Sequence, residues 1–261
     1  MKTICVIPAR YSSTRLPGKP LKLIAGVPMI CRVYDRASQA QLIDKAIVAT
    51  DDERIYNAVK EHGGEAMMTR ADHPTGTDRL AEVANNFEDV DLIVNVQGDE
   101  PLIEPSLIDN LINLFIEDSN SESNNNSSFI IPNSSLLQMA TVATELKDEE
   151  EIKNPNNVKV ITDLNNYAMY FSRSQIPYPR NAGKSNTYKH IGIYAYRRDF
   201  LLKYAKMTPT PLEQTESLEQ LRALENGYKI KVLHSDNQFI GVDTEEDLQL
   251  VNDIYNKMLS K

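Results

Sequence analysis

Three cationic side chains follow the first apolar segment of the chain within a short distance. Residues 4–7 are a continuous apolar run, which predicts a buried strand, and Pro8 is expected to end it because proline donates no ladder hydrogen bond. Arg10, Arg15 and Lys19 come next, among small and polar residues. A strand that runs into such a loop is how many α/β proteins hold phosphates, so the segment is a candidate phosphate site.

The residues between these cations also suit an anion. Ser12, Ser13 and Gly18 leave backbone N–H groups accessible to a ligand. Arginine presents a planar fork to phosphate oxygens, while lysine acts as a point charge. The loop contains neither G-x-G-x-x-G nor G-x-x-x-x-G-K-[ST], so it is not a dinucleotide or P-loop fingerprint. A solvated basic loop is the alternative interpretation.

A second set of reactive side chains follows the apolar run at residues 92–96. Gln97, Asp99 and Glu100 come directly after it, and ligands of parallel sheets bind at the carboxyl ends of the strands. A carboxylate beside a triphosphate suits Mg²⁺, which takes hard oxygen ligands and bridges phosphates. The alternative is that Asp99 caps a helix expected to start near Pro105. The phosphate-type loop on the first strand favours the metal role.

A third candidate anion site lies at residues 69–79. Arg70 and Arg79 accompany the expected start of a helix, which Thr75 or Thr77 is suited to cap. Helix N-termini favour negative charge, so both arginines are candidate nucleotide ligands. A capped surface turn without a ligand explains the same pattern.

Alternating strand and helix patterns position these groups. Strands are expected at residues 4–7, 44–50, 65–68 and 92–96, and helices at 29–38, at 53–62, and starting near residues 75–77 and 105. This alternation predicts an α/β fold with a Rossmann-like, mostly parallel sheet flanked by helices and joined by right-handed crossovers.

The second half of the chain has more strands and fewer helices. Strands are expected at residues 140–144, 158–162, 167–172 and 191–196, which predicts a smaller strand-rich lobe at about residues 139–212 within a single domain covering 1–261. A single helix is expected at residues 211–224. The Asn/Ser-rich stretch 118–128 lacks apolar periodicity and is interpreted as a mobile loop.

The overall composition limits the possible partners. The chain has 261 residues, 41% of them hydrophobic, with a formal net charge of −9. Such a chain repels nucleic acid in general, so a phosphate site must be a local patch of cations. Two cysteines, Cys5 and Cys31, give neither a disulfide framework nor a zinc spacing. Without a secretory signal or an apolar run near the ~20 residues of a membrane span, we expect a cytoplasmic protein that binds neither nucleic acid nor membrane.

Six separated motifs resemble those of the sugar nucleotidyltransferases, and in particular of the 3-deoxy-manno-octulosonate cytidylyltransferase (CMP-KDO synthetase) family. They are P-A-R-Y-S-S-T-R-L-P-G-K-P-L at residues 8–21, R-A-D-H-P-T-G-T-D-R at 70–79, V-N-V-Q-G-D-E-P at 94–101, F-S-R at 171–173 with H-I-G-I-Y at 190–194, L-E-Q-L-R at 218–222 and G-V-D-T-E-E-D-L at 241–248. Thr75 and Asp78 replace the family's serine and glutamate with similar chemistry. The stretch 118–128 is longer than the family's usual connection.

The resemblance implies the fold of the nucleotide-diphospho-sugar transferases and a homodimer. It also implies a reaction in which CTP and 3-deoxy-D-manno-octulosonate (KDO) give CMP-KDO and pyrophosphate, activating KDO for lipopolysaccharide biosynthesis, with Mg²⁺ as cofactor. The roles carried over are catalysis by Arg10, Lys19 and Asp99; nucleotide binding by Arg10, Ser13, Arg15, Lys19, Arg70 and Arg79; sugar binding by Gln97, Arg173, His190, Tyr194, Glu219 and Gln220; and metal binding by Asp99 and Asp243.

Other interpretations stay open from the sequence. The chain is alternatively a cytidylyltransferase for another acid sugar, such as a sialic acid or an amino-substituted KDO. A non-catalytic nucleotide-binding relative is less favoured, because it predicts the loss of a metal acid and both Asp99 and Asp243 are present. For single residues, His190 and Tyr194 suit a packed core, and Asp243 suits a helix cap.

Overall fold

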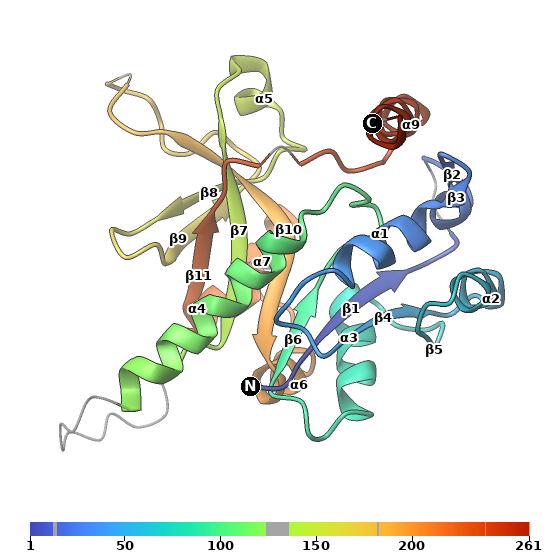
Figure 1. Cartoon of the computed structure of the whole chain (residues 1–261). Helices are drawn as coiled ribbons and strands as arrows, with labels where there is room; N and C mark the ends of the chain where they lie inside the picture. The colour runs from blue at the N-terminus through green and yellow to red at the C-terminus, as the bar shows by residue number, and fades with distance from the viewer. Residues whose placement is uncertain (13–14, 124–135, 182, 238, 261) are drawn as a thin grey trace. The chain divides into compact units, whose positions relative to one another are not determined.

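The computed structural model describes residues 1–12, 15–123, 136–181, 183–237 and 239–260 (Figure 1). The chain divides into two compact units, Met1–Asp109 with Phe239–Lys261, and Asn110–Gln238. The second unit contains the lobe predicted at about residues 139–212 and extends beyond it at both ends. Whether the chain acts as a single domain stays a prediction.

The first unit is built on a parallel sheet, as the alternating pattern predicts. Its strands lie in the order β6-β1-β4-β5, with β1 paired to both β4 and β6 in parallel. They are β1 (Thr3–Ala9), β4 (Lys45–Thr50), β5 (Ala66–Met68) and β6 (Leu92–Asn95). β6 is buried throughout, and β1 and β4 are buried at all but one position each, because helices cover both faces of such a sheet. The mixed α/β fold class is confirmed.

Pro8 does not end the first strand, which continues to Ala9. Val6 accepts a hydrogen bond from Val96 on the β6 side, and Pro8, two residues on, faces the same side. β6 ends at Asn95, so no ladder partner requires a donor from Pro8, while β1 continues to pair with β4. A proline at a local sheet edge is tolerated for this reason.

Side-chain caps determine where two of the helices of this unit begin. Its helices before residue 100 are α1 (Met29–Ala37), α2 (Glu53–Glu61) and α3 (Gly76–Asn85). The Asp52 side chain accepts from the N–H of Arg54 at the start of α2. Thr75, rather than Thr77, caps α3 in a reciprocal capping box with Asp78. The expected helices are confirmed to within one or two residues.

The C-terminal helix α9 (Glu245–Leu259) belongs to the first unit. It contacts β2 (Leu23–Ile24), which pairs with β3 (Val27–Pro28) in a small hairpin. A short 3-10 helix, η1 (Lys19–Leu21), precedes this hairpin in the chain. One buried cluster joins Leu16, Ile24 and Met29 to Val242, Leu248, Val251 and Tyr255. The cluster therefore fixes the first loop against the end of the chain.

The second unit is built mainly on antiparallel strands. Their order is β11-β7-β10-β8-β9, where only the β11–β7 pair is parallel. The strands are β7 (Met139–Leu146), β8 (Lys159–Thr162), β9 (Ala168–Ser172), β10 (Thr187–Arg197) and β11 (Ile230–His234), and the helices are α5 (Glu149–Lys153), α6 (Arg198–Tyr204), α7 (Pro211–Glu216) and α8 (Leu221–Glu225). The strand-rich character expected from the sequence is confirmed.

The long helix α4 (Pro105–Ser123) corrects the loop predicted at residues 118–128. Residues 118–123 are helical, and residues 124–128 lie outside the described residues. Asp118 accepts from the N–H of Leu137 at 2.6 Å and lies 3.6 Å from Arg197, so tertiary contacts hold a turn of weak helix propensity. Neither α4 nor any other helix in the described part of the chain is long and apolar enough to cross a membrane.

The single helix predicted at residues 211–224 is two short helices. Ser217, with a φ of 52°, adopts the left-handed conformation between α7 and α8. The N–H of Leu218 then donates to Glu213 O, as in a helix C-cap. This break forms a turn of residues 217–220 that carries two of the predicted sugar contacts, Glu219 and Gln220.

Candidate active site

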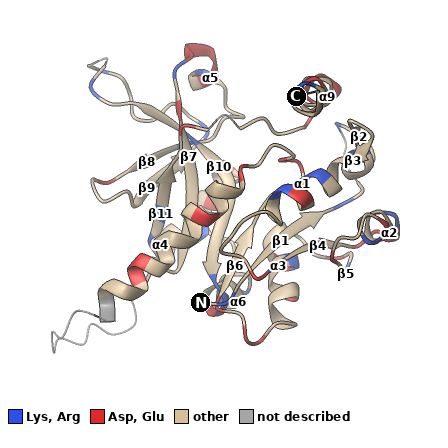
Figure 2. Ribbon diagram, in the orientation of Figure 1, with Lys and Arg blue, Asp and Glu red and all other residues tan. Residues whose placement is uncertain are grey.

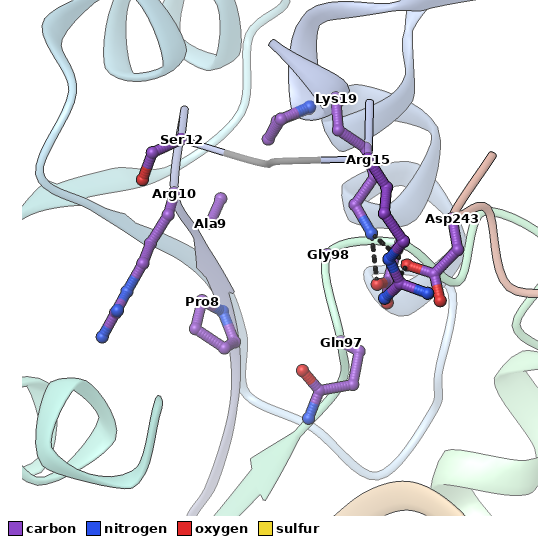
Figure 3. A pocket seen from close by; sticks show the side chains of 11 residues that line it. Pro8, Ala9, Arg10, Ser12, Arg15, Lys19, Gln97, Gly98 and Asp243 are labelled. Carbon is purple, nitrogen blue, oxygen red and sulfur yellow. Dashed lines mark hydrogen bonds and ion pairs between the residues drawn. The ribbon is translucent and has the colours of Figure 1, made fainter. Parts of the chain in front are cut away.

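A cavity of about 340 Å³ lies in the first unit, where β1 and β6 end (Figure 3). Its walls are formed by the first loop, by the segment after β6 and by the segment before α9. It is lined by Pro8, Ala9, Arg10, Ser12, Arg15, Lys19, Pro20, Gln97, Gly98, Asp99 and Asp243. The structure therefore brings together the phosphate-type loop and both acids proposed as metal ligands. Ser13 lies outside the described residues.

Lys19 connects the two acids of this cavity. Its Nζ lies 2.7 Å from Asp99 Oδ2 and 3.0 Å from Asp243 Oδ1. Burial alone lowers the pKa of Lys19, but these two carboxylates outweigh it and raise the pKa above its ordinary value. Lys19 is therefore a fixed positive charge. The left-handed Gly18 (φ 67°), immediately before it, has Tyr11 about 3.1 Å from where a Cβ would stand, so a side chain there would be strained.

Backbone contacts bring the segments that carry the acids together. The N–H of Val242 donates to Asp99 O at 2.9 Å. Gly98 lies so close to the first strand that an added Cβ would come within 2.9 Å of Pro8 O. Glycine is required at this position because the two chain segments approach each other directly. Asp243 precedes the cap of α9, which Thr244 and Asp247 form, so the capping alternative for Asp243 is wrong.

The two arginines of the first loop occupy different parts of the cavity. Arg15 is exposed and pairs with Asp243 Oδ1 at 3.1 Å. Arg10 extends away from this pair in Figure 3, and its Nη2 donates to His73 O at 2.7 Å. Their charges are thus spread over the cavity, which suits an extended polyanion such as a triphosphate.

Arg70 and Arg79 do not line this cavity. The Arg70 side chain is 69% exposed and pairs with Asp72 at 2.6 Å. The Arg79 side chain is fully buried, pairs with Asp51 at 3.0 Å and also donates to Thr69 Oγ1. Desolvation lowers the pKa of Arg79, but the guanidinium stays protonated, and the ion pair with Asp51 offsets part of the cost of burying its charge. Their nucleotide-binding roles stay predictions, and the buried position gives Arg79 a structural function as well.

Asp99 and Asp243 suit a magnesium ion. Two carboxylate oxygens already converge on one cationic group, the ammonium of Lys19. Among the described residues, no group of three or more histidine, cysteine or acidic side chains is placed to hold a metal by itself. Mg²⁺ commonly takes one or two carboxylates and completes its shell with phosphate oxygens and water. The donor set therefore fits a metal that arrives with a triphosphate.

The second unit contains the predicted sugar contacts other than Gln97, which lines the cavity of the first unit. His190 and Tyr194 are adjacent on β10, with ring centroids 5.4 Å apart. Burial lowers the pKa of His190 to about 3 and raises that of Tyr194 well above its ordinary value. Both side chains are therefore neutral near pH 7, so a contact of either one with a sugar would be a hydrogen bond rather than an ion pair.

Arg173 is held by backbone carbonyls. Its Nε donates to Glu216 O at 2.7 Å, Nη1 to Pro155 O at 3.2 Å and Nη2 to Ser217 O at 3.4 Å. An arginine has five N–H donors, so two remain for a ligand. The proposed pairing with a sugar carboxylate stays a prediction, and Arg173 additionally ties β9 to the turn after α7.

Two charged residues that the sequence did not single out support Arg173. Glu216 accepts from Ser172 Oγ at 2.7 Å and from the N–H of Arg173 at 3.0 Å. Lys159 is fully buried and donates to three carbonyls, those of Asn154, Asn157 and Arg173. No local sequence signal identifies the role of Glu216, because its partners Ser172 and Arg173 lie more than 40 residues away in the sequence.

Glu219 and Gln220 lie in the turn between α7 and α8. Tyr204 donates to Glu219 O at 2.6 Å, and Arg222 forms a buried ion pair with Glu213, so the turn is fixed on both sides. Gln220 is 5% exposed, and its Nε2 has no hydrogen-bond partner among the residues the structure describes. A buried donor of this kind is suited to a ligand hydroxyl or carboxylate.

Figure 2 shows how charged residues are distributed along the described part of the ribbon. Lysine and arginine are scattered among acidic residues there, and α5 begins with Glu149, Glu150 and Glu151. Positive charge of functional interest is therefore local, as the net charge of −9 requires.

Comparison with known proteins assigns the chain to a family. The family described as cytidylyltransferase matches residues 4–230. The chain belongs to the cytidylyltransferase family. A protein of Fusobacterium nucleatum named 3-deoxy-manno-octulosonate cytidylyltransferase is 56% identical over 96% of each chain. One of Pelobacter propionicus with the same name is 47% identical over the full length of both chains.

Solved cytidylyltransferase structures share the fold. A structure titled CMP:2-keto-3-deoxy-manno-octonic acid synthetase complexed with CTP has a TM-score of 0.89 and 42% identity, and the match covers 99% of this chain and 100% of that one. A cytidylyltransferase from Leptospira borgpetersenii matches at a TM-score of 0.60 and 16% identity, which shows the fold alone. The family resemblance identified from the six motifs is confirmed.

Proposed function

We propose that this cytidylyltransferase joins CTP to 3-deoxy-D-manno-octulosonate and releases pyrophosphate. The observation that carries the proposal is the cavity in which Lys19 lies between Asp99 and Asp243, with Arg10 and Arg15 beside them. Transfer of a metal-bound nucleotide requires cations for the phosphates and acids for the metal. The loop after β1 supplies the cations, and the segments after β6 and before α9 supply the acids. The full-length relatives, which bear the name of this activity, support KDO as the sugar.

In the reaction, the anomeric hydroxyl oxygen of KDO attacks the α-phosphorus of CTP and loses its proton to solvent. The bond between that phosphorus and the oxygen bridging to the β-phosphate breaks, and pyrophosphate leaves. Arg10, Arg15 and Lys19 would hold the triphosphate and then the leaving pyrophosphate. Little covalent chemistry is required of the protein, so positioning and neutralisation of charge supply most of the acceleration. Lys19 suits this task because its raised pKa keeps it charged.

Asp99 and Asp243 would hold Mg²⁺ together with phosphate oxygens. When bound, the metal neutralises charge on the α-phosphate and lowers the pKa of the attacking hydroxyl. Arg173, His190, Tyr194, Glu219, Gln220 and Gln97 would bind the acid sugar. Gln220 Nε2, which has no hydrogen-bond partner among the described residues, supports a sugar contact in the second unit. A homodimer and a cytoplasmic location remain predictions.

An assay of pyrophosphate release tests the proposal. The purified chain is incubated with Mg²⁺, CTP and one of three sugars, KDO, an amino-substituted KDO or a sialic acid. We expect turnover with KDO at a kcat/KM at least tenfold above the other sugars. Higher kcat/KM with another acid sugar would make it the substrate, and no turnover with any sugar would favour a nucleotide-binding relative.

A further inference from the structure

The Thr141 hydroxyl is shared between a histidine and two backbone carbonyls. Thr141 is fully buried on β7, and its Oγ1 lies 3.0 Å from His190 Nε2. The same oxygen lies 2.8 Å from Ile193 O and 3.1 Å from Ile191 O. These contacts fall where β10 changes register against β7, between Ile191 and Tyr194.

The donors and acceptors of this cluster determine where its protons lie. A hydroxyl has one proton to donate, and a carbonyl oxygen can only accept. Because the shortest contact of Thr141 Oγ1 is to Ile193 O, the hydroxyl proton belongs there. Thr141 then has only lone pairs for His190, so Nε2 must carry a proton and donate it.

The surroundings of His190 keep its ring neutral. Phe171 packs edge-on against it at 5.1 Å, and Tyr194 lies at 5.4 Å, so both neighbouring rings are uncharged. A neutral imidazole protonated on Nε2 has a bare Nδ1 that can only accept. The hydrogen bond of the ring runs through Nε2, and Nδ1 forms none with the described residues.

We propose that Thr141 is a positioning residue that holds His190 as its Nε2–H tautomer and thereby presents Nδ1 as an acceptor for a hydroxyl group of the acid sugar. The part concerning the sugar rests on the proposed function, whereas the tautomer does not. Thr141 also holds the irregular segment of β10 through Ile191 O and Ile193 O, which fixes the backbone on both sides of the histidine and tyrosine.

The tautomer is measured directly by NMR of the protein labelled with ¹⁵N-histidine. Couplings between ring protons and nitrogens distinguish a protonated from a bare nitrogen, and the His190→Asn spectrum assigns His190 among the four histidines of the chain. We expect protonated Nε2 and bare Nδ1 at pH 7.5. A ring protonated on Nδ1 alone, or on both nitrogens, overturns the proposal. This measurement needs no variant of Thr141.

Variants of Thr141 test its positioning role. Thr141→Val removes the hydroxyl with little change in volume, and Thr141→Ser keeps it. We expect Thr141→Val to populate the other tautomer and to raise the KM for KDO by roughly two- to tenfold, the value of one hydrogen bond, with the KM for CTP unchanged. Thr141→Ser should restore both the tautomer and the KM. An unchanged tautomer in Thr141→Val overturns the role of Thr141.

A control on the same strand separates a local effect from general loosening of β7. The hydroxyl of Thr144 contacts Asn237 O at 3.4 Å rather than His190. Thr144→Val should leave the tautomer and both KM values unchanged, and a shift equal to that of Thr141→Val would overturn the assignment. If the chain turns over no KDO yet shows the Nε2–H tautomer, the proposed substrate fails while the tautomer stands.

Discussion

The N–H of Val242 donates to the carbonyl oxygen of Asp99 at 2.9 Å. This bond joins segments far apart in the sequence and places Asp243 beside Asp99, on the same ammonium of Lys19. The two acids therefore form one site although different segments supply them. The cluster that packs α9 against the first loop stabilises the same arrangement.

Neutralising either acid should remove most activity without unfolding the chain. Asp99→Asn and Asp243→Asn each delete a charge that would hold Mg²⁺, so we expect kcat/KM to fall by about 10²–10³, the usual effect of removing one electrostatic group from a polar transition state. Steady-state kinetics across a Mg²⁺ titration measures this. Glu245→Gln, which removes a surface acid 3.6 Å from Lys22, is the control and should keep activity. Near-normal kcat in Asp99→Asn or Asp243→Asn at saturating Mg²⁺ would exclude that residue as a ligand.

Gly98→Ala should distort the cavity. Its Cβ would come within 2.9 Å of the backbone oxygen of Pro8, and neither atom can move without its own backbone, so the segments must separate. We expect the free energy of unfolding to fall by about 1–3 kcal/mol, together with a lower kcat/KM. Urea unfolding and steady-state kinetics check both. Gly76→Ala, where nothing lies within 4 Å, should change neither, and equal behaviour of the two variants would contradict the prediction.

Arg173→Lys tests the proposed contact with the sugar carboxylate. Lysine keeps the charge but loses the fork, so the KM for KDO should rise roughly ten- to a hundredfold while the KM for CTP changes little. The lost bonds to Glu216 O and Ser217 O should also lower the melting temperature. The exposed Arg180 supplies the matched control, Arg180→Lys. A weakened CTP KM with an unchanged sugar KM would assign Arg173 to the nucleotide instead.

His190 should make stability depend on pH. Its pKa is about 3 in the folded chain against 6.5 ordinarily, so between these values the unfolded chain binds one more proton. Its stabilising effect is therefore complete above about pH 6.5 and is lost as pH falls toward 3, by about 1.4 kcal/mol per pH unit. Urea unfolding at pH 7.5 and 5.0 should show wild type losing about 1–2 kcal/mol more than His190→Gln. Parallel losses in the two proteins would mean that the histidine is protonated in the folded state.

Much of the fold follows from local sequence signals. Apolar runs at residues 4–7 and 92–96 identify strands of the first sheet, and Asp52 and Thr75 start their helices through bonds to the next turn. These signals act within a few residues, so they can be recognised from the sequence without the tertiary structure. The first-loop cations and Asp99 were found for the same reason, since polar residues after a buried strand indicate a site.

Other features depended on contacts between distant segments. The helical state of residues 118–123 depends on Leu137 and Arg197, and the position of Pro8 depends on where β6 stops. Such contacts outweigh local propensity, which is worth only tenths of a kcal/mol per residue.

The sequence by itself determined the family, the type of fold and the chemical kinds of residue available for nucleotide transfer. Only the tertiary structure decided how those residues are used. In the folded chain, Arg79 is buried in an ion pair with Asp51, and Arg173 donates to backbone carbonyls. The Thr141 hydroxyl forms a hydrogen bond with His190. The reason is physical: a side chain's charge, free donors and tautomer depend on burial and on hydrogen-bond partners, and these are set by chain segments that meet only after folding.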